Sequence, residues 1–126
     1  MIRGIGGVFL YADNAPALVE WYTRHLGIKF DYEPTERSHY RDFVLPLDPA
    51  YGRQEHEVFA IRQAASPRSE PSWRPVINLR VQDLAVLLAH LRSAGIEVER
   101  AENYDYGRFA WLKDAEGNQL ELFEPV

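Results

Sequence analysis

The chain has 126 residues, 46% of them hydrophobic and 26% charged, which is typical of a single globular domain. It has no cysteine, which excludes disulfides and thiolate metal sites, and its net charge of −5 without a basic run disfavours a nucleic-acid partner. No stretch approaches the roughly 20 apolar residues that cross a bilayer, and residues 1–7 lack the apolar core of a signal peptide, so we expect a cytoplasmic protein without a membrane partner.

The first half of the chain predicts a strand, a helix and three more strands. Residues 5–12 are rich in Val, Phe, Leu and Tyr, which is typical of a buried strand. Asp13 or Asn14 offers an N-cap, apolar residues at helical spacing predict a helix over 15–26, and Gly27 ends it. Three further strands are expected over residues 28–33, 40–47 and 55–63.

The second half follows a linker rich in Ser and Pro at residues 65–75. A strand is predicted over 76–81 and a helix over 84–94, capped by Asp83 and ended by Gly95. Three strands are then expected over residues 96–100, 108–113 and 119–123.

The two halves repeat the same order of elements. Tyr11-Ala12-Asp13 corresponds to Val81-Gln82-Asp83, and Leu26-Gly27-Ile28 corresponds to Ala94-Gly95-Ile96. The sequence therefore predicts an α+β fold in one domain, residues 1–126, with a first βαβββ module over 1–64 and a second over 76–126.

Two motifs carry a resemblance to a known family. The helix ending Trp21-Tyr22 and then Leu26-Gly27-Ile28 resembles the "FYxxxLG" opening of vicinal-oxygen-chelate proteins, and residues 114–123 (DAEGNQLELF) resemble their closing "DPxGNxxEL" motif, with Ala115 in place of proline. The chain thus resembles the glyoxalase/bleomycin-resistance/extradiol-dioxygenase (vicinal oxygen chelate) superfamily over nearly its whole length, as a glyoxalase-like protein.

The resemblance implies an architecture and an assembly. The two modules would form a curved mixed sheet, or half-barrel, around a cavity, with the helices on the outer face. Family members are commonly dimers, so a homodimer is the expected partner state, which the prevalence of two-fold homo-oligomers also favours.

The resemblance also implies where a metal would bind. Metal-using members place one ligand on the first and one on the last strand of each half; here the first-strand positions are Gly6 and Val76, which cannot ligate through a side chain. Glu121 occupies one last-strand position, and Glu57 occupies the other if residues 57–59 align with 121–123. Two carboxylates alone make a poor transition-metal site, so we expect no cofactor, with a divalent metal at Glu57 and Glu121 as the alternative.

Strand alternation indicates which side chains would face the cavity. Ile77 and Leu79 suit packing on a helix, so Asn78 and Arg80 fall on the other face, where they could anchor a carboxylate or carbonyl. Equally, Arg80 could pair with Glu121. Glu121 itself could be a catalytic base or a structural carboxylate held by Arg80 or Tyr106.

Aromatic and histidine side chains add further candidates. Tyr104, Tyr106, Phe109 and Trp111 lie in or before one strand, and alternation turns some of them inward, either to wall a pocket or simply to pack. The predicted ligand-binding residues are Asn78, Arg80, Tyr106, Trp111 and Phe123. His39 and His56 fall on strands and could reach the cavity, although a structural or surface role is the commoner one; a one-residue slip in the alignment would exchange Glu57 for His56.

Three functions remain open. The first is a protein that binds a small organic molecule in its cavity, without metal. The second is a lyase, isomerase or dioxygenase that acts on a small carbonyl substrate, with Glu121 as base or metal ligand and with Asn78 and Arg80 as oxyanion partners. The third is a non-catalytic structural or dimerisation domain with a filled core.

Overall fold

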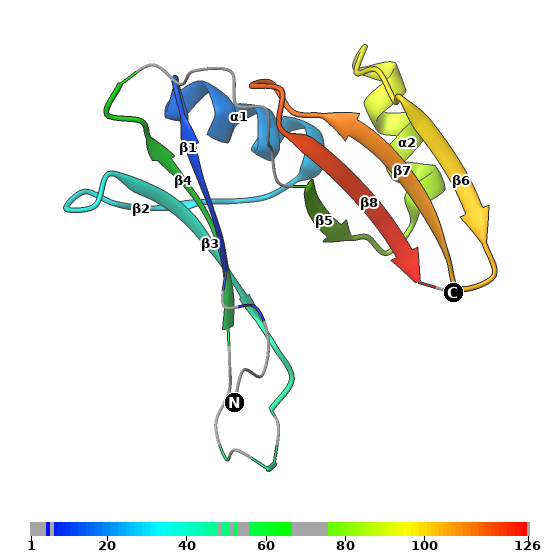
Figure 1. Ribbon diagram of the computed structural model, residues 1–126, viewed down its shortest axis with the longest axis horizontal. Helices are drawn as coiled ribbons and strands as arrows, with labels where there is room; N and C mark the ends of the chain where they lie inside the picture. Colours follow the sequence, from blue (N-terminus) through cyan, green and yellow to red (C-terminus); the bar gives the residue numbers. More distant parts are fainter. Residues whose placement is uncertain are drawn as a thin grey trace. The chain divides into compact units, whose positions relative to one another are not determined.

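The computed structural model describes residues 5, 7–47, 49–50, 52, 56–66 and 76–125 (Figure 1). Within these residues the elements follow in the order β1 (Gly7–Ala12), α1 (Ala15–Leu26), β2 (Asp31–Glu33), β3 (Ser38–Val44), β4 (His56–Gln63), β5 (Val76–Arg80), α2 (Leu84–Ser93), β6 (Arg100–Tyr104), β7 (Gly107–Lys113) and β8 (Gln119–Pro125). Most of the predicted linker, residues 67–75, lies outside the described residues, as does Gly6. No helix in the described part is long and apolar enough to cross a membrane.

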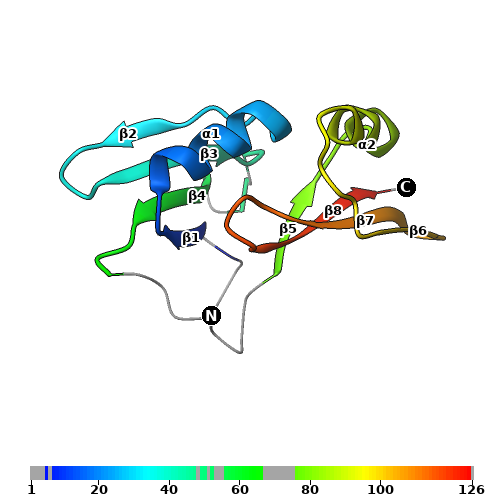
Figure 2. The same ribbon diagram turned by 90° about the horizontal axis from the view of Figure 1, so that it is seen from above.

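Two four-stranded mixed sheets confirm the predicted α+β fold of two βαβββ modules. The first sheet has the order β1-β4-β3-β2 and the second the order β5-β8-β7-β6. In each, the first and last strands of the module pair in parallel, and the remaining neighbours are antiparallel. Neither sheet closes into a barrel within the described residues (Figure 2).

The chain forms two compact units, which we describe separately. The first comprises Met1–Val19 and Ile28–Arg68 and contains the first sheet. The second comprises Glu20–Gly27 and Ser69–Val126 and contains the second sheet, so the last part of α1 groups with the second unit.

Hydrogen bonds at the helix starts repeat from one module to the other. Asn14 Oδ1 accepts a bond from the Ala17 amide at 3.1 Å, and Asp83 Oδ1 accepts one from the Val86 amide at 3.1 Å. The first amide of each helix donates to a side chain from the end of the module's last strand. Ala15 N bonds to Gln63 Oε1 at 2.9 Å, and Leu84 N bonds to Glu124 Oε1 at 2.7 Å. Asn14, rather than Asp13, is therefore the counterpart of Asp83, which moves the repeat alignment by one residue.

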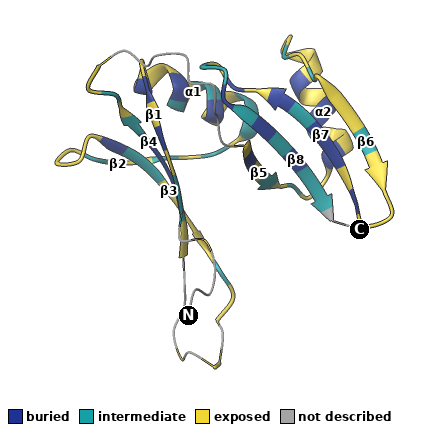
Figure 3. Cartoon of the chain, in the orientation of Figure 1, coloured by how far each residue is buried: buried dark blue, intermediate teal, exposed yellow. Residues whose placement is uncertain are grey.

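Alternating burial separates the two faces of each sheet (Figure 3). In the second unit, Ile77, Leu120 and Leu122 are buried on the face that packs on α2, which contacts β7 and β8. Val76, Asn78 and Arg80 are exposed on the other face, as the sequence predicts. Burial of each such apolar side chain contributes about 1.5–3 kcal/mol, so this register is strongly favoured over a one-residue slip.

Strands β2 and β6 start later than predicted: β2 at Asp31 instead of residue 28, and β6 at Arg100 instead of residue 96. Gly95 has a φ of 78°, and the amides of Gly95 and Ile96 bond back to Arg92 and Leu91, which closes the end of α2. Pairing in β6 runs over Arg100–Tyr104 instead of residues 96–100, because these residues face β7 across a two-residue turn. Its polar sequence, RAENY, carries little strand signal by itself.

The closing motif forms a buried turn tied to the opening motif. The carboxylate of Asp114 accepts bonds from the backbone amides of Glu116 and Asn118, both at 2.9 Å, and from the side chain of Asn118 at 2.7 Å. The Tyr22 hydroxyl donates to the same carboxylate at 2.6 Å. Gly117 has a φ of 82°, a backbone conformation that would be strained in a residue with a β-carbon. Both motifs therefore act structurally here, as one hydrogen-bonded unit.

Candidate functional site

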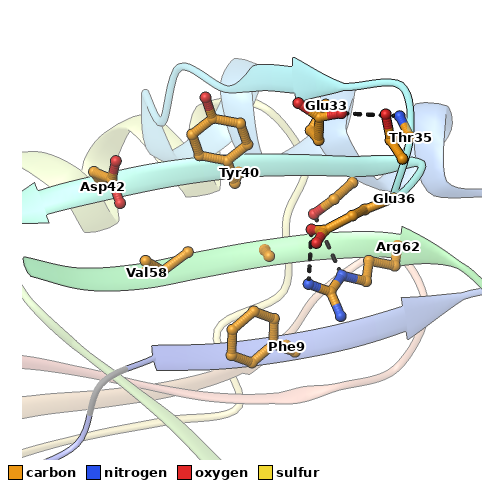
Figure 4. Close-up of a pocket in the computed structure, with 10 residues that line it drawn as sticks. Phe9, Glu33, Thr35, Glu36, Tyr40, Asp42, Val58 and Arg62 are labelled. Atoms are coloured by element: carbon orange, nitrogen blue, oxygen red, sulfur yellow. Dashed lines mark hydrogen bonds and ion pairs between the residues drawn. The ribbon is translucent and has the colours of Figure 1, made fainter.

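A hollow of about 610 Å³ lies on one face of the first sheet (Figure 4). It is lined by Phe9, Glu33, Thr35, Glu36, Ser38, Tyr40, Asp42, Val58, Ala60 and Arg62. Its strand residues alternate with those that face the other side of the sheet, where Phe59 and Ile61 are buried. The hollow is thus built by the period-2 geometry of β1, β3 and β4.

The strand register arranges the floor of the hollow in rows. Tyr40, Ala60 and Phe9 stand opposite one another across β3, β4 and β1. Ala60 is 1% exposed, whereas Phe9 is 48% exposed. Ala60 is thus covered by the side chains around it, and the more exposed Phe9 and Tyr40 present the surface at the centre of the hollow.

Arg62 occupies one end of the hollow. Its guanidinium carbon lies 4.7 Å from the centre of the Phe9 ring, and its Nη2 lies 3.4 Å from Glu36 Oε2. Nε donates to the hydroxyl of the buried Ser38 at 3.4 Å, and Nη1 donates to the Tyr11 hydroxyl at 3.5 Å. The charge of Arg62 is therefore largely taken up by neighbours of its own sheet.

Asp42 occupies the other end. It stands opposite Val58 in the register, four residues along β3 from Ser38, which corresponds to about 13 Å. Figure 4 shows Asp42 and Arg62 at opposite ends of the hollow. Among the described residues, the carboxylate of Asp42 forms no ion pair or hydrogen bond. Glu33, at the rim, accepts a bond from the Thr35 amide at 2.9 Å.

The predicted site residues gather on the face of the second sheet turned away from α2. Asn78, Glu121 and Trp111 form one row across β5, β8 and β7. The next row contains Arg80 and Phe123. Tyr106 lies in the turn between β6 and β7 and is 66% exposed.

Stacked aromatic rings cover part of this face. Phe109 stacks on Phe123 at a centroid distance of 4.7 Å and on Trp111 at 5.8 Å. Tyr104 and Tyr106 stack on each other at 5.5 Å, and both meet the Phe109 ring edge-on. The other candidates, Asn78, Arg80 and Glu121, form no side-chain hydrogen bond or ion pair within the described part of the chain. The alternative in which Arg80 pairs with Glu121 is therefore not seen.

The residues at the family's metal positions do not fit a metal. Aligning the repeats on the caps Asn14 and Asp83 gives Gly7 as the counterpart of Val76, and Ala60 as the counterpart of Glu121. Only one of these four side chains can ligate. Glu57, the predicted partner, stands opposite Phe43 on the face of the first sheet away from the hollow. No cluster of three or more His, Cys, Asp or Glu suited to a metal occurs among the described residues.

The two strand histidines differ in position. His39 stands opposite Ile61 on the face away from the hollow, its ring 4.6 Å from that of Tyr32, and burial lowers its pKa. His56 alternates with Glu57 onto the hollow side at the start of β4, where it is exposed and outside the lining.

Reasoning from the sequence missed all ten lining residues, among them Phe9, Tyr40, Asp42 and Arg62. Alternation along residues 7–12 and 38–44 is the signal that could have found them. The candidates predicted in the first sheet were the expected metal positions and the strand histidines, and the lining residues lie elsewhere in that sheet.

Comparison with known proteins identifies the family. The Glyoxalase/Bleomycin resistance protein/Dioxygenase superfamily matches residues 4–122. No curated protein sequence matches the chain significantly.

Solved structures share the fold at low sequence identity. TnmS3, an antibiotic binding protein from Streptomyces sp. CB03234, has a TM-score of 0.71 and 17% identity, covering 99% of this chain and 98% of that one. TioX from Micromonospora sp. ML1 has a TM-score of 0.69 and 16% identity, covering 98% and 100%. Lactoylglutathione lyase from Agrobacterium tumefaciens has a TM-score of 0.66 and 15% identity, covering 98% and 94%. With the family matched over almost its full length, the chain belongs to the glyoxalase/bleomycin resistance protein/dioxygenase superfamily.

Proposed function

We propose that the chain binds a small organic molecule in the hollow of the first sheet. The observation that carries the proposal is the hollow itself, about 610 Å³ in volume, with Ala60 as its floor between Phe9 and Tyr40. Ligand pockets commonly measure about 300–1,000 Å³ and combine apolar walls with a few polar groups at fixed positions. A filled-core structural domain would not need this opening.

Binding without a metal suits the residues of both sheets. Three of the four residues at the family's metal positions are Gly7, Ala60 and Val76, which have no side-chain atom that could bind a metal. TnmS3, an antibiotic binding protein with this fold, supports an organic ligand for this chain, and the identity of 17% leaves the ligand itself open. The predicted homodimer and cytoplasmic location remain part of this proposal, and native mass spectrometry of the purified protein tests the dimer.

A thermal-shift screen with ring-containing compounds tests the binding site. A compound present at about 100 times its dissociation constant should stabilise the protein by about 2.7 kcal/mol. Phe9→Ala should raise the dissociation constant at least severalfold, and so lower this stabilisation, because it removes one wall of the hollow. Phe43→Ala is the matched control, since Phe43 is a similarly exposed ring (40% against 48% for Phe9) on the opposite face of the same sheet. Equal losses in the two variants, or no stabilising compound, would contradict the proposal.

Catalysis at Glu121 is the second candidate function, and the geometry of one row favours it. Glu121 is half-buried, has no side-chain partner among the described residues, and stands between Asn78 and Trp111. A half-buried carboxylate beside an amide could remove a proton next to a carbonyl, while Asn78 and Arg80 bind the oxygen.

Exchange of deuterium into the carbon next to the carbonyl, followed by NMR over a panel of small α-carbonyl compounds, tests the catalytic role. Glu121→Gln should slow exchange by about 10²–10⁴-fold while leaving thermal stability nearly unchanged. Glu102→Gln, on the same face two strands away, should leave the rate unchanged. A large loss of stability in Glu121→Gln would instead assign that carboxylate a structural role.

A further inference from the structure

The charge of the hollow on the first sheet determines which organic molecules it should accept. Three carboxylates, Glu33, Glu36 and Asp42, line it together with a single guanidinium, that of Arg62. At neutral pH this gives the lining a net charge of −2. Anionic ligands are therefore disfavoured, and cationic ones are attracted before any contact is made.

The negative charge is not evenly available. Glu36 lies 3.4 Å from Arg62, and Glu33 is bonded to the backbone of its own turn. Asp42 has neither an ion-pair nor a hydrogen-bond partner among the described residues, and it stands beside the aromatic row. Of the three carboxylates, Asp42 is the one free to meet a ligand.

The aromatic floor leads toward Asp42. A β-carbon placed on Gly7 would lie 3.3 Å from Cε2 of Phe9, so the Phe9 ring leans from its own row toward the row of Gly7, Val58 and Asp42. A flat group that lies against Phe9 and Tyr40 thus has the carboxylate of Asp42 in the next row.

Arg62 does not cancel this attraction. The rows of Arg62 and Asp42 are about 13 Å apart along the strands, and the Arg62 guanidinium is already paired with Glu36 at 3.4 Å. Its own position over Phe9 and beside Glu36 shows that the lining already accommodates a cation on an aromatic face.

We infer that the hollow selects a molecule that carries a flat ring and a protonated amine, with the ring against Phe9 and Tyr40 and the ammonium group at Asp42. This inference rests on the proposed function and names the class of ligand for the same site. It assigns Asp42 as the residue that determines specificity, and Phe9 and Tyr40 as the residues that provide apolar contact.

Titration by NMR with three probes of matched size separates the inference from the proposed function. The probes are 2-phenylethylamine, 2-phenylethanol and 3-phenylpropionate at pH 7. The amine should bind about two- to fivefold more tightly than the alcohol, the range expected for one solvent-accessible ion pair, and the carboxylate should bind most weakly. Raising the salt from 0.02 to 0.5 M should narrow the gap between amine and alcohol.

Two variants locate the effect. Asp42→Asn should bring the affinity for the amine down to that for the alcohol and leave the affinity for the alcohol unchanged. Glu57→Gln removes the same charge from the face of β4 away from the hollow and should keep the preference for the amine. Preference retained in Asp42→Asn, or equal binding of all three probes to the unmodified protein, overturns the inference while leaving the binding function intact. If none of the probes shifts the amide signals of β1, β3 and β4, the proposed function itself fails.

Discussion

At the scale of single residues, Gly107 makes room for the stacked rings of the second sheet. A β-carbon there would lie 2.3 Å from Cε2 of Phe123 and 3.0 Å from the backbone oxygen of Glu124. The Phe123 ring lies over this gap and stacks on Phe109 at 4.7 Å. The φ of Gly107 lies outside the left-handed region, so its backbone conformation does not require glycine. The glycine is needed because a larger residue would have no space there.

Replacing Gly107 with alanine should therefore displace Phe123 and break its stack. We expect the free energy of unfolding to fall by about 1–3 kcal/mol, the usual cost of overpacking, as measured by urea denaturation. The same change in a Phe123→Leu background should cost clearly less, because the shorter side chain vacates the space above the glycine. Additive losses in the double variant would show that the backbone of β8, rather than the ring, is what the new methyl group strikes.

Gly7 shows the same relation in the first sheet and explains why the hollow was hard to predict. Its added β-carbon would meet the Val58 carbonyl oxygen at 2.6 Å and the Phe9 ring at 3.3 Å. In both modules a glycine opposite the last strand lets an aromatic ring lie flat on the sheet. The sequence contains these glycines, but only the strand register reveals which ring covers which glycine.

At the scale of the elements, local signals predicted the helices best. Asp83 before α2 and the glycines after both helices lie where caps are favoured, and α1 begins and ends at the predicted residues. Strands with polar sequences were predicted less well. β6 forms where β7, across a two-residue turn, provides its hydrogen-bonding partner, and the polar sequence of β6 by itself does not indicate that pairing.

For the candidate site too, features that follow from a local pattern were predicted, and features that depend on the pairing between strands were not. Alternation along residues 76–81 correctly separated Asn78 and Arg80 from the core, since one apolar face and one polar face have a strong period of 2. The first-module counterpart of Glu121 required the register between strands. The caps at Asn14 and Asp83 move the alignment to Ala60, whereas the short similarity of residues 57–59 to residues 121–123 had suggested Glu57.

At the scale of the whole molecule, the order of elements and the internal repeat were sufficient to predict the α+β fold. Both modules bury apolar residues of their last strand, and both tie their helix to the end of that strand through Gln63 or Glu124. The duplicated scaffold leaves the opposite face of each sheet free to differ. One face carries the acidic hollow with Asp42, and the other carries the aromatic stack with Glu121.

The hydrogen bond between Tyr22 and Asp114 should make the fold less stable as the pH rises above 10. Tyr22 is fully buried, and burial, the nearby charge of Asp114 and the hydrogen bond to that carboxylate all raise its pKa far above the ordinary value of 10. The folded protein therefore keeps this proton at a pH where the unfolded chain has lost it. The resulting stabilisation is fully present below pH 10, and as pH rises further it should decline by about 1.4 kcal/mol per pH unit.

Tyr22→Phe should reveal this dependence in urea unfolding measured between pH 8 and pH 11. At pH 8 the variant should be less stable by about 1.5–3 kcal/mol, because a buried carboxylate loses a hydrogen-bond donor. Above pH 10 the unmodified protein should lose stability more steeply than the variant, so the difference between them should shrink. Tyr32→Phe, at a half-exposed tyrosine of the first sheet, is the control and should lower the stability at pH 8 by much less than Tyr22→Phe. A difference for Tyr22→Phe that stays constant over this pH range would mean that the Tyr22 proton does not link the fold to pH.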